Sequence, residues 1–565
     1  MQAKKTISLL LAVLLVAAGI AGCAQTATPG DNAATAAPNA AAPAPSDGSS
    51  AVVEKGASIV RTEEDWPTYY DPAVGSDYSD STTQANVYDP LVFPMPDGSI
   101  RPHVATEWTV SDDSLTYTFK IRNDVKFHSG NLMKASDVAY SMNRMLDIGE
   151  GYAYLFTGVV QECTAPDDTT VVFKLTKPFG PFVNALIRMM IVEEATVKAH
   201  YDLTDTTYGD KGDYGKKWML TNDAGSGPYK TKEFKLDEYF LGEKFDDYFL
   251  GWQEGAPKYF KISGMVEPVA VRTAVANKEL EITDEIQPLE NYNTMDAIDG
   301  VDLATWENGN TFNMMLNTKA QYTDDVHLRK AIAYCFDYET LRTAIYPGAG
   351  ESHGPVSRVL PGYDPTVPAY TRDINKAKEE LAQSKYANEK ITLNLTWCAE
   401  VPEQEKIALL LQSNLAELGI DLVITKKPFG SMITDAQSVE TTPQISFVNM
   451  ASPYFEAGGM LKTRYHSSSC GSWEQMEWLQ DPKLDAMIED ALATVDNDAR
   501  FTKYAEIQHY IYDLCPTIWG FNWIEKRAVQ TGYLTWGAME ATKSGSNFYM
   551  PMGYAIYAHD MQVTN

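Results

Sequence analysis

The stretch SDDSLTYTFKIRNDVKFHSGNLMKASDVAYSMNR, residues 111–144, has the clearest local pattern in this chain. Between positions 115 and 122 apolar and polar residues alternate, which is typical of a half-buried strand. Val138, Met142 and Met145 then recur at the spacing of one helix face. A second strand pattern, VVFKL, occupies residues 171–175 after a turn-forming Asp-Thr-Thr. This region therefore predicts two partner strands with a helix between them in the sequence.

Helix signals dominate the second half of the chain, with strands between them. Residues 407–418 present one apolar helix face, Gly419 is expected to end that helix, and residues 420–425 read as a strand. Helix N-caps are expected at four aspartates: Asp324, Asp337, Asp373 and Asp481, the last followed by a proline. Strands and helices that alternate at this density predict α/β lobes.

The N-terminal sequence indicates export. Residues 1–22 contain two lysines and then an apolar run too short to span a bilayer, as in a signal peptide. The run ends in Ala-Gly-Cys, and small residues before Cys23 resemble a bacterial lipobox, where the cysteine is lipidated. Residues 23–56 are nearly all small or polar and predict a disordered tether. We therefore expect a protein anchored by Cys23 to the outer face of the cell membrane.

Composition limits the class of protein. The formal net charge of −30 argues against nucleic acid or anionic lipid surfaces as partners. The chain is 44% hydrophobic, and its roughly 510 residues beyond the tether predict a globular body of two or three lobes. Five cysteines beyond Cys23 are scattered without a CxxC spacing, so no zinc site is expected.

Several motifs occur in the order of a known family. They include YDPLV from Tyr88, the 111–144 block, GSGPY from Gly225, and DDVHLRKAIAYCFDYETL from Asp324. Together these motifs cover about residues 65–530. The chain resembles the extracytoplasmic solute-binding proteins of family 5, the substrate-binding lipoproteins of peptide and nickel ABC importers.

The resemblance implies an α/β, type II periplasmic-binding-protein-like fold with two lobes and three domains. Domain I would combine residues 57–97, 224–308 and 526–565, domain II would be 98–223, and domain III 309–525. Two crossing strands near residues 310–312 and 522–523 would form the hinge. The ligand would bind between lobes that close on it.

One departure from the family concerns the ligand anchor. Peptide binders of this family often carry a Trp-x-x-Asp-Tyr-type segment whose aspartate pairs with the α-ammonium of the peptide. The corresponding residues 447–455 read FVNMASPYF and contain neither the Trp nor the Asp. Glu456 lies nearby and is a candidate substitute for the missing acid.

Aromatic residues are the other candidates for the cleft. Trp397 lies where a strand ends, at the edge where α/β clefts bind ligands. Flat rings suit both sugar faces and peptide side chains. The predicted ligand-binding residues are Trp66, Tyr69, Trp397, Tyr454, Phe455, Glu456, Trp519 and Trp523. For each aromatic residue, packing in the core is the competing interpretation.

Catalytic and metal motifs are missing from the sequence. No HExxH pair, nucleophile elbow or phosphate loop occurs, and His128 in the 111–144 block is interpreted as structural. We therefore expect no enzyme activity, no cofactor and no metal; a nickel chelate held by one histidine is the minor alternative.

The sequence thus predicts a monomeric, lipid-anchored receptor that delivers a solute to ABC permease subunits. An oligopeptide is the expected ligand, and an oligosaccharide is the alternative favoured by the missing anchor. A secreted hydrolase and a sensory or adhesive protein of the same fold are the competing classes.

Overall fold

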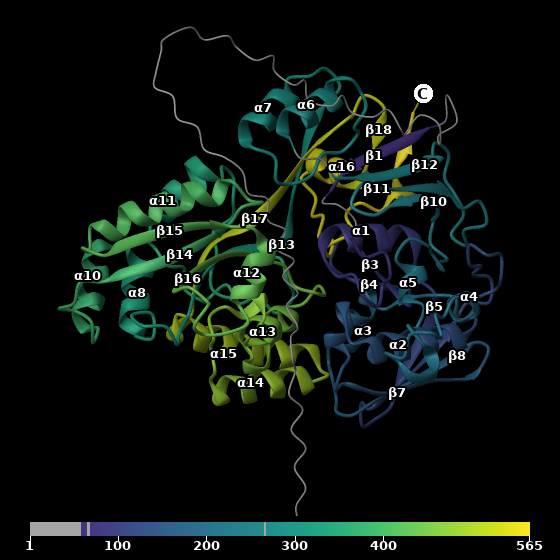
Figure 1. Ribbon diagram of the computed structural model, residues 1–565, viewed down its shortest axis with the longest axis horizontal. Helices are drawn as coiled ribbons and strands as arrows, with labels where there is room; N and C mark the ends of the chain where they lie inside the picture. Colours follow the sequence, from purple (N-terminus) through teal and green to yellow (C-terminus); the bar gives the residue numbers. More distant parts are fainter. Residues whose placement is uncertain (1–57, 65–67, 265–266, 565) are drawn as a thin grey trace, which may run out of the picture. The chain divides into compact units, whose positions relative to one another are not determined.

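The structure is a computed structural model that describes residues 58–64, 68–264 and 267–564. Three larger sheets, drawn in Figure 1, take their strands from separate parts of the chain. The predicted signal peptide, Cys23, the whole tether and Trp66 lie outside the described residues. The statements made about them from the sequence stay predictions.

The quoted stretch contributes β6 to an antiparallel four-stranded sheet in the order β5-β6-β8-β7, and it also contains most of helix α2. Tyr117 pairs with Phe173 and Phe119 with Val171, so the two predicted strands are partners. The apolar stripe of the intervening helix is buried, and the helix packs mainly against β7 and β8 of this sheet. The elements are β5 (Ala105–Val110), β6 (Thr116–Ile121), α2 (Ala135–Ile148), β7 (Val160–Asp167) and β8 (Thr170–Leu175).

A second sheet joins the beginning of the described chain to a stretch 200 residues later. Its order is β1-β12-β11-β10, with β1 parallel to β12 and the other pairs antiparallel. The strands are β1 (Ile59–Glu63), β10 (Tyr229–Lys235), β11 (Tyr239–Lys244) and β12 (Tyr259–Ser263). Nearby helices are α1 (Tyr78–Val87), α6 (Pro268–Ala276), α7 (Leu289–Asp296) and α16 (Gly537–Ser544).

The third sheet has the order β15-β14-β16-β13-β17 and contains the two longest strands. In Figure 1 helix α11 lies above β14 and β15, whereas α13 to α15 lie below this sheet. The strands are β13 (Asp302–Leu316), β14 (Thr392–Cys398), β15 (Asp421–Lys427), β16 (Ile445–Met450) and β17 (Thr517–Val529). The helices are α8 (Val326–Cys335), α10 (Ile374–Gln383), α11 (Glu403–Ala416), α12 (Phe429–Asp435), α13 (Ala457–Tyr465), α14 (Pro482–Ala493) and α15 (Asn497–Leu514).

Strands β13 and β17 connect this sheet to the second one. They pair at Thr311 with Asn522, where crossing strands were predicted. Farther along, Val529 of β17 forms a bridge with Ile282, which in turn bridges to Thr62 of β1. Both strands run across the domain boundaries predicted at 308/309 and 525/526, and the three-domain division stays a prediction.

Three of the four predicted helix caps are confirmed, and one is wrong by a residue. Asp337, Asp373 and Asp481 accept hydrogen bonds from the first turns of their helices. Helix α8 is capped by Asp325, whose carboxylate accepts from the Leu328 amide, and not by Asp324. Asp324 instead pairs with Lys385, because the helix starts one residue later than expected.

The remaining elements are short. Strand pairs are β2 (Asp89–Pro90) with β9 (Met190–Ile191), β3 (Val92–Pro94) with β4 (Ile100–Pro102), and β18 (Leu534–Thr535) with β19 (Gln562–Val563). Short helices are α3 (Phe182–Ala185), α4 (Glu194–Ala199), α5 (Lys216–Met219) and α9 (Tyr338–Thr340).

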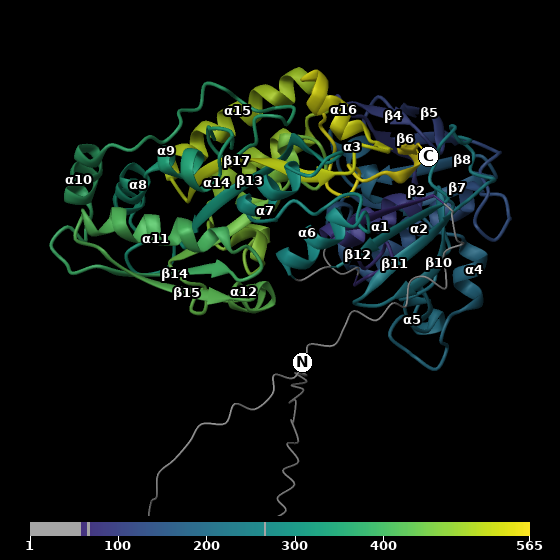
Figure 2. The ribbon, with the colours of Figure 1, turned by 90° about the horizontal axis from the view of Figure 1, so that it is seen from above.

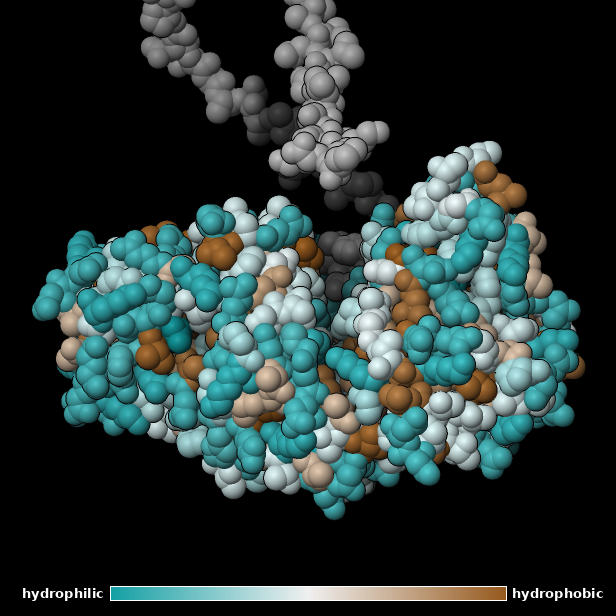
Figure 3. Space-filling view, turned by 90° about the horizontal axis from the view of Figure 1, so that it is seen from below, coloured by the Kyte–Doolittle hydropathy of each residue, from teal (hydrophilic) through white to brown (hydrophobic). Residues whose placement is uncertain are grey.

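The face drawn in Figure 3 is mainly polar, and the described cysteines form no disulfide bond. Figure 3 shows one face as mainly hydrophilic, with apolar side chains in small separate groups. No helix within the described ranges is both long and apolar enough to cross a membrane. The five described cysteines are all free thiols.

Candidate functional site

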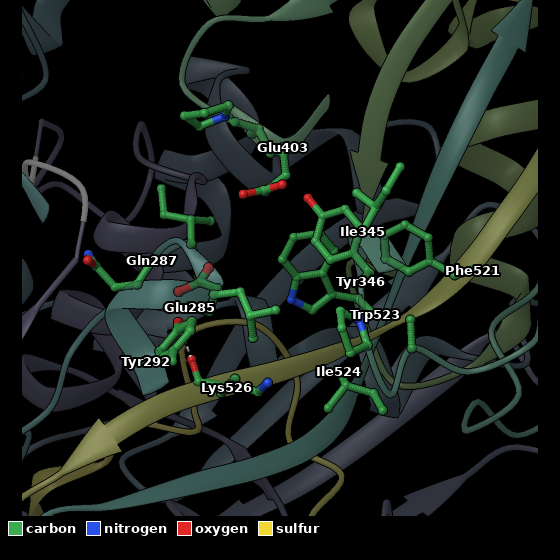
Figure 4. Close-up of a pocket in the computed structure, with 16 residues that line it drawn as sticks. Glu285, Gln287, Tyr292, Ile345, Tyr346, Glu403, Phe521, Trp523, Ile524 and Lys526 are labelled. Carbon is green, nitrogen blue, oxygen red and sulfur yellow. Dashed lines mark hydrogen bonds between the residues drawn. The ribbon is translucent and has the colours of Figure 1, made fainter. Parts of the chain in front are cut away.

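A cavity of about 680 Å³, including space open to solvent, lies beside strand β17. Its lining comes from four separate segments of the chain: residues 285–292, 345–349, 401–403 and 521–526. Figure 4 shows that the walls differ, with rings on one side and polar groups on the other.

Three aromatic rings form one wall. The rings of Tyr346 and Phe521 lie 4.6 Å apart between centroids, and Trp523 lies 5.2 Å from Tyr346. Phe521 and Trp523 share one face of β17 because they are two positions apart. Of these three residues only Trp523 belongs to the predicted set.

A glycine-containing turn brings Tyr346 to this wall. The π-helical turn η4 (Leu341–Ile345) ends here, and the Tyr346 amide donates to the Leu341 carbonyl. Four residues on, Gly350 exchanges two backbone hydrogen bonds of 2.9 and 3.1 Å with Asn522 of β17. The chain is thereby joined to β17 next to Phe521. Nothing in the sequence linked residues 345–350 to the site, because this pairing joins positions about 170 apart.

One polar group on the other side, Glu285, belongs to a buried network around Arg527. Its guanidinium is fully buried and donates to Glu64 at 2.8 Å, Glu285 at 2.7 Å and Glu525 at 2.7 Å. Burial raises the pKa of Glu64 to about 8, although Arg527 acts in the opposite direction. The Arg527 guanidinium is the shared counter-charge of three carboxylates. Removal of Arg527 would therefore leave all three without this positive partner.

The charged side chains that line the cavity differ in their pairing. Glu285 is bound to Arg527, and Glu403 forms an ion pair of 2.8 Å with Lys406. The ammonium of Lys526 lies 5.7 Å from the Tyr292 ring centroid and has no ion-pair partner among the described residues. Burial lowers the pKa of Lys526.

Trp397 and Trp519 are buried away from the lining. Trp397 is at the end of β14 as predicted, is 3% exposed, and has Lys426 at 5.1 Å from its ring. The Trp519 indole donates to the Tyr465 hydroxyl at 2.9 Å and stacks on Tyr370. Neither lines the cavity, and a role for them in binding stays a prediction.

Residues 454–456, which lie where the family's aspartate anchor was expected, are also buried. Tyr454 is 1% exposed, and Phe455 stacks on Tyr549 at 5.9 Å. The Glu456 carboxylate accepts hydrogen bonds from Arg500 and from the Tyr504 hydroxyl, the latter at 2.8 Å. Both oxygens of Glu456 are therefore already engaged within the protein.

Tyr69 differs from the others because half of its surface is exposed. Its backbone amide donates to Asp80 at 2.8 Å, and it does not line the cavity. Trp66, three positions earlier, lies outside the described residues. Of the eight predicted residues, the structure thus places one in the cavity wall.

His128 has the structural surroundings that its motif suggested. Its Nδ1 lies 2.7 Å from Asp223 and its Nε2 lies 2.9 Å from the Gly227 carbonyl. Two acceptors for two ring nitrogens favour the imidazolium, and although burial opposes the charge, Asp223 raises the pKa of His128. The ion pair holds the GSGPY turn, where Gly225 passes so close to Val87 that a Cβ atom would clash.

This pair should make stability depend on pH. The folded pKa of His128 exceeds its ordinary 6.5, so its contribution is complete below pH 6.5 and is lost as the pH rises through the folded pKa. In that window we expect the unfolding free energy to fall by up to about 1.4 kcal/mol per pH unit. Urea unfolding from pH 6 to 9 should show a shallower slope for His128→Gln. The exposed His200→Gln is the control, and parallel profiles for wild type and His128→Gln would contradict the assignment.

Among the described residues, no group of three or more histidine, cysteine, aspartate or glutamate side chains could hold a metal ion. What the cavity offers is an aromatic wall, hydrogen-bonding groups and a few charges, an arrangement suited to holding a small molecule.

Comparisons with known proteins agree with this arrangement. A family model described as bacterial extracellular solute-binding proteins, family 5 (middle region), matches residues 99–472. The probable D,D-dipeptide-binding periplasmic protein DdpA of Escherichia coli K12 is 26% identical over 482 residues, which cover 84% of this chain and 89% of that protein.

Two solved structures are similar over 90% of this chain. The substrate-binding protein CtaP of Listeria monocytogenes superposes with a TM-score of 0.76 at 23% identity, over 100% of its chain. The protein DppA of Helicobacter pylori, solved with the peptide STSA, gives 0.75 at 19% identity, over 98% of its chain. At these identities the structures bear on the fold alone, and they confirm the predicted type II periplasmic-binding-protein-like α/β class.

Proposed function

We propose that this chain, which belongs to the bacterial extracellular solute-binding proteins of family 5, is the lipid-anchored receptor of an ABC importer for peptides. It would capture a peptide outside the cytoplasm, close on it and present it to permease subunits, without converting it. The observation that supports binding is the cavity beside β17, because its lining joins four segments along a strand that connects two sheets.

Peptide as the ligand rests on the relatives. DdpA is named as a probable D,D-dipeptide-binding protein, and the Helicobacter pylori DppA structure holds the peptide STSA. An oligosaccharide is the second candidate, because the aromatic wall of Tyr346, Phe521 and Trp523 would also suit a sugar face.

Thermal unfolding with a ligand panel tests this proposal. Purified protein is mixed with di-, tri- and pentapeptides and with oligosaccharides of similar size. A ligand that binds only the folded state stabilises it by about 2.7 kcal/mol at 100 times its Kd. We expect peptides to raise the melting temperature and to be recovered unchanged by mass spectrometry. Stabilisation by saccharides alone would favour the second candidate, and hydrolysis of the peptides would overturn the receptor assignment.

The anchor rests on the sequence alone, since Cys23 follows an Ala-Gly pair and precedes the polar tether. A diacylated cysteine is expected, because a single acyl chain binds membranes only marginally. Cys23→Ala should move the protein from the membrane fraction to the soluble fraction. Equal retention of variant and wild type on the membrane would contradict anchoring at Cys23.

A further inference from the structure

Two hydrogen-bond donors in the cavity wall lack an acceptor. The indole N–H of Trp523 is buried and has no hydrogen-bond partner among the described residues. The Lys526 ammonium forms no ion pair within the same ranges. Both residues belong to β17, and Figure 4 shows the nitrogen of Lys526 below the indole of Trp523. A buried donor without an acceptor is costly, so its retention suggests an acceptor supplied from outside.

The other charges on the lining are not available in the same way. Glu285 is paired with Arg527, and Glu403 is paired with Lys406. Of the charged side chains that line the cavity, Lys526 is therefore the one without an ion-pair partner in the described part of the chain. Its ammonium can attract an anionic group of a ligand. A carboxylate can accept from an ammonium and from an N–H at the same time, and the free end of a peptide ligand carries one.

The space beside these donors is apolar. Ile345, Tyr346, Val401, Phe521 and Ile524 surround it together with the Trp523 ring. A polar side chain placed there would lose its hydration without gaining partners, whereas a large apolar side chain would gain burial.

We propose that Lys526 and Trp523 bind the terminal carboxylate of a peptide whose last residue places a bulky apolar side chain against Tyr346 and Phe521. This inference rests on the proposed function and adds the ligand's orientation and side-chain class. It makes Lys526 a determinant of affinity for free carboxylates and the aromatic wall a determinant of side-chain preference.

Calorimetry with three probes tests it on the purified full chain: Ala-Ala-Phe, Ala-Ala-Ala and Ala-Ala-Phe amide. Burial of the phenyl group should make Ala-Ala-Phe bind about tenfold or more tightly than Ala-Ala-Ala. Amidation should weaken Ala-Ala-Phe by about tenfold or more, because a charge-assisted contact is lost.

Variants assign the effect to the two donors. Lys526→Met should weaken binding of Ala-Ala-Phe by about tenfold. Binding of the amide should stay nearly unchanged, because the amide has no carboxylate for Lys526 to contact. Trp523→Phe keeps a ring and should cost about threefold to tenfold for the free acid. Lys174→Met, an exposed lysine on another sheet, is the control.

The outcomes separate the two levels of the proposal. If no peptide binds wild type, the proposed function itself fails. If peptides bind but acid and amide are equal, or if Lys526→Met weakens both equally, the carboxylate site is wrong. If Ala-Ala-Ala binds as tightly as Ala-Ala-Phe, the apolar subsite is wrong. Melting temperatures without peptide show whether each variant is folded.

Discussion

Replacement of Arg527 by Met should lower the free energy of unfolding by about 3–5 kcal/mol, the range for breaking a buried ion pair by removing one partner. Arg527 is fully buried and faces Glu64, Glu285 and Glu525 at 2.7–2.8 Å. Without the guanidinium these carboxylates would lie together with no counter-charge. Because they come from different segments, their repulsion would also loosen the strand that carries the cavity wall.

Urea unfolding at pH 7.5 measures the effect, with Lys174→Met as the matched control. Lys174 pairs with Glu162 at 2.9 Å, but both side chains are about half exposed. Exposed pairs contribute about 0–1 kcal/mol, so the control should stay close to wild type. Equal losses for the two variants would show that the Arg527 network does not stabilise the fold.

The second large effect is expected at Glu456. Glu456→Gln should cost about 3 kcal/mol of stability, because it leaves the Arg500 guanidinium without its counter-charge. Arg500 donates to both carboxylate oxygens at 2.9 Å, and both side chains are nearly completely buried. Coupling can be measured with Arg500→Met: the double variant should lose about 1–3 kcal/mol less than the sum of the single variants.

The same variant separates an internal ion pair from a ligand anchor. With its oxygens bound to Arg500 and Tyr504, Glu456 should contribute little to recognition of an α-ammonium. We therefore expect Glu456→Gln to leave the affinity ratio of free to N-acetylated peptides unchanged. Selective loss of binding for peptides with a free amino terminus would instead make Glu456 the relocated anchor.

Local patterns were sufficient for much of the fold. The alternation at 115–122 and the run at 171–175 predicted β6 and β8, because the period of a half-buried strand is set by neighbouring residues. Capping aspartates act within three residues of themselves, which explains why Asp373 and Asp481 were recognised. The order of the motifs along the chain indicated the family and therefore the fold class, because this order can be read directly from the sequence.

The site was decided by contacts that no local pattern encodes. Trp519 and Trp523 lie on one strand, yet the first stacks on Tyr370 in the core and the second lines the cavity. No residue near Glu456 in the sequence indicates an ion-pair partner. In the structure Arg500 of α15, 44 positions later in the chain, binds its carboxylate. Tyr346 reaches the wall because Gly350 pairs with Asn522 of β17. Sequence alone thus determined the family and those elements that have a clear local pattern, because both depend on neighbours and order. Which aromatic rings and charges face the cavity was decided by tertiary structure alone, because pairing between distant segments determines which side chains are covered.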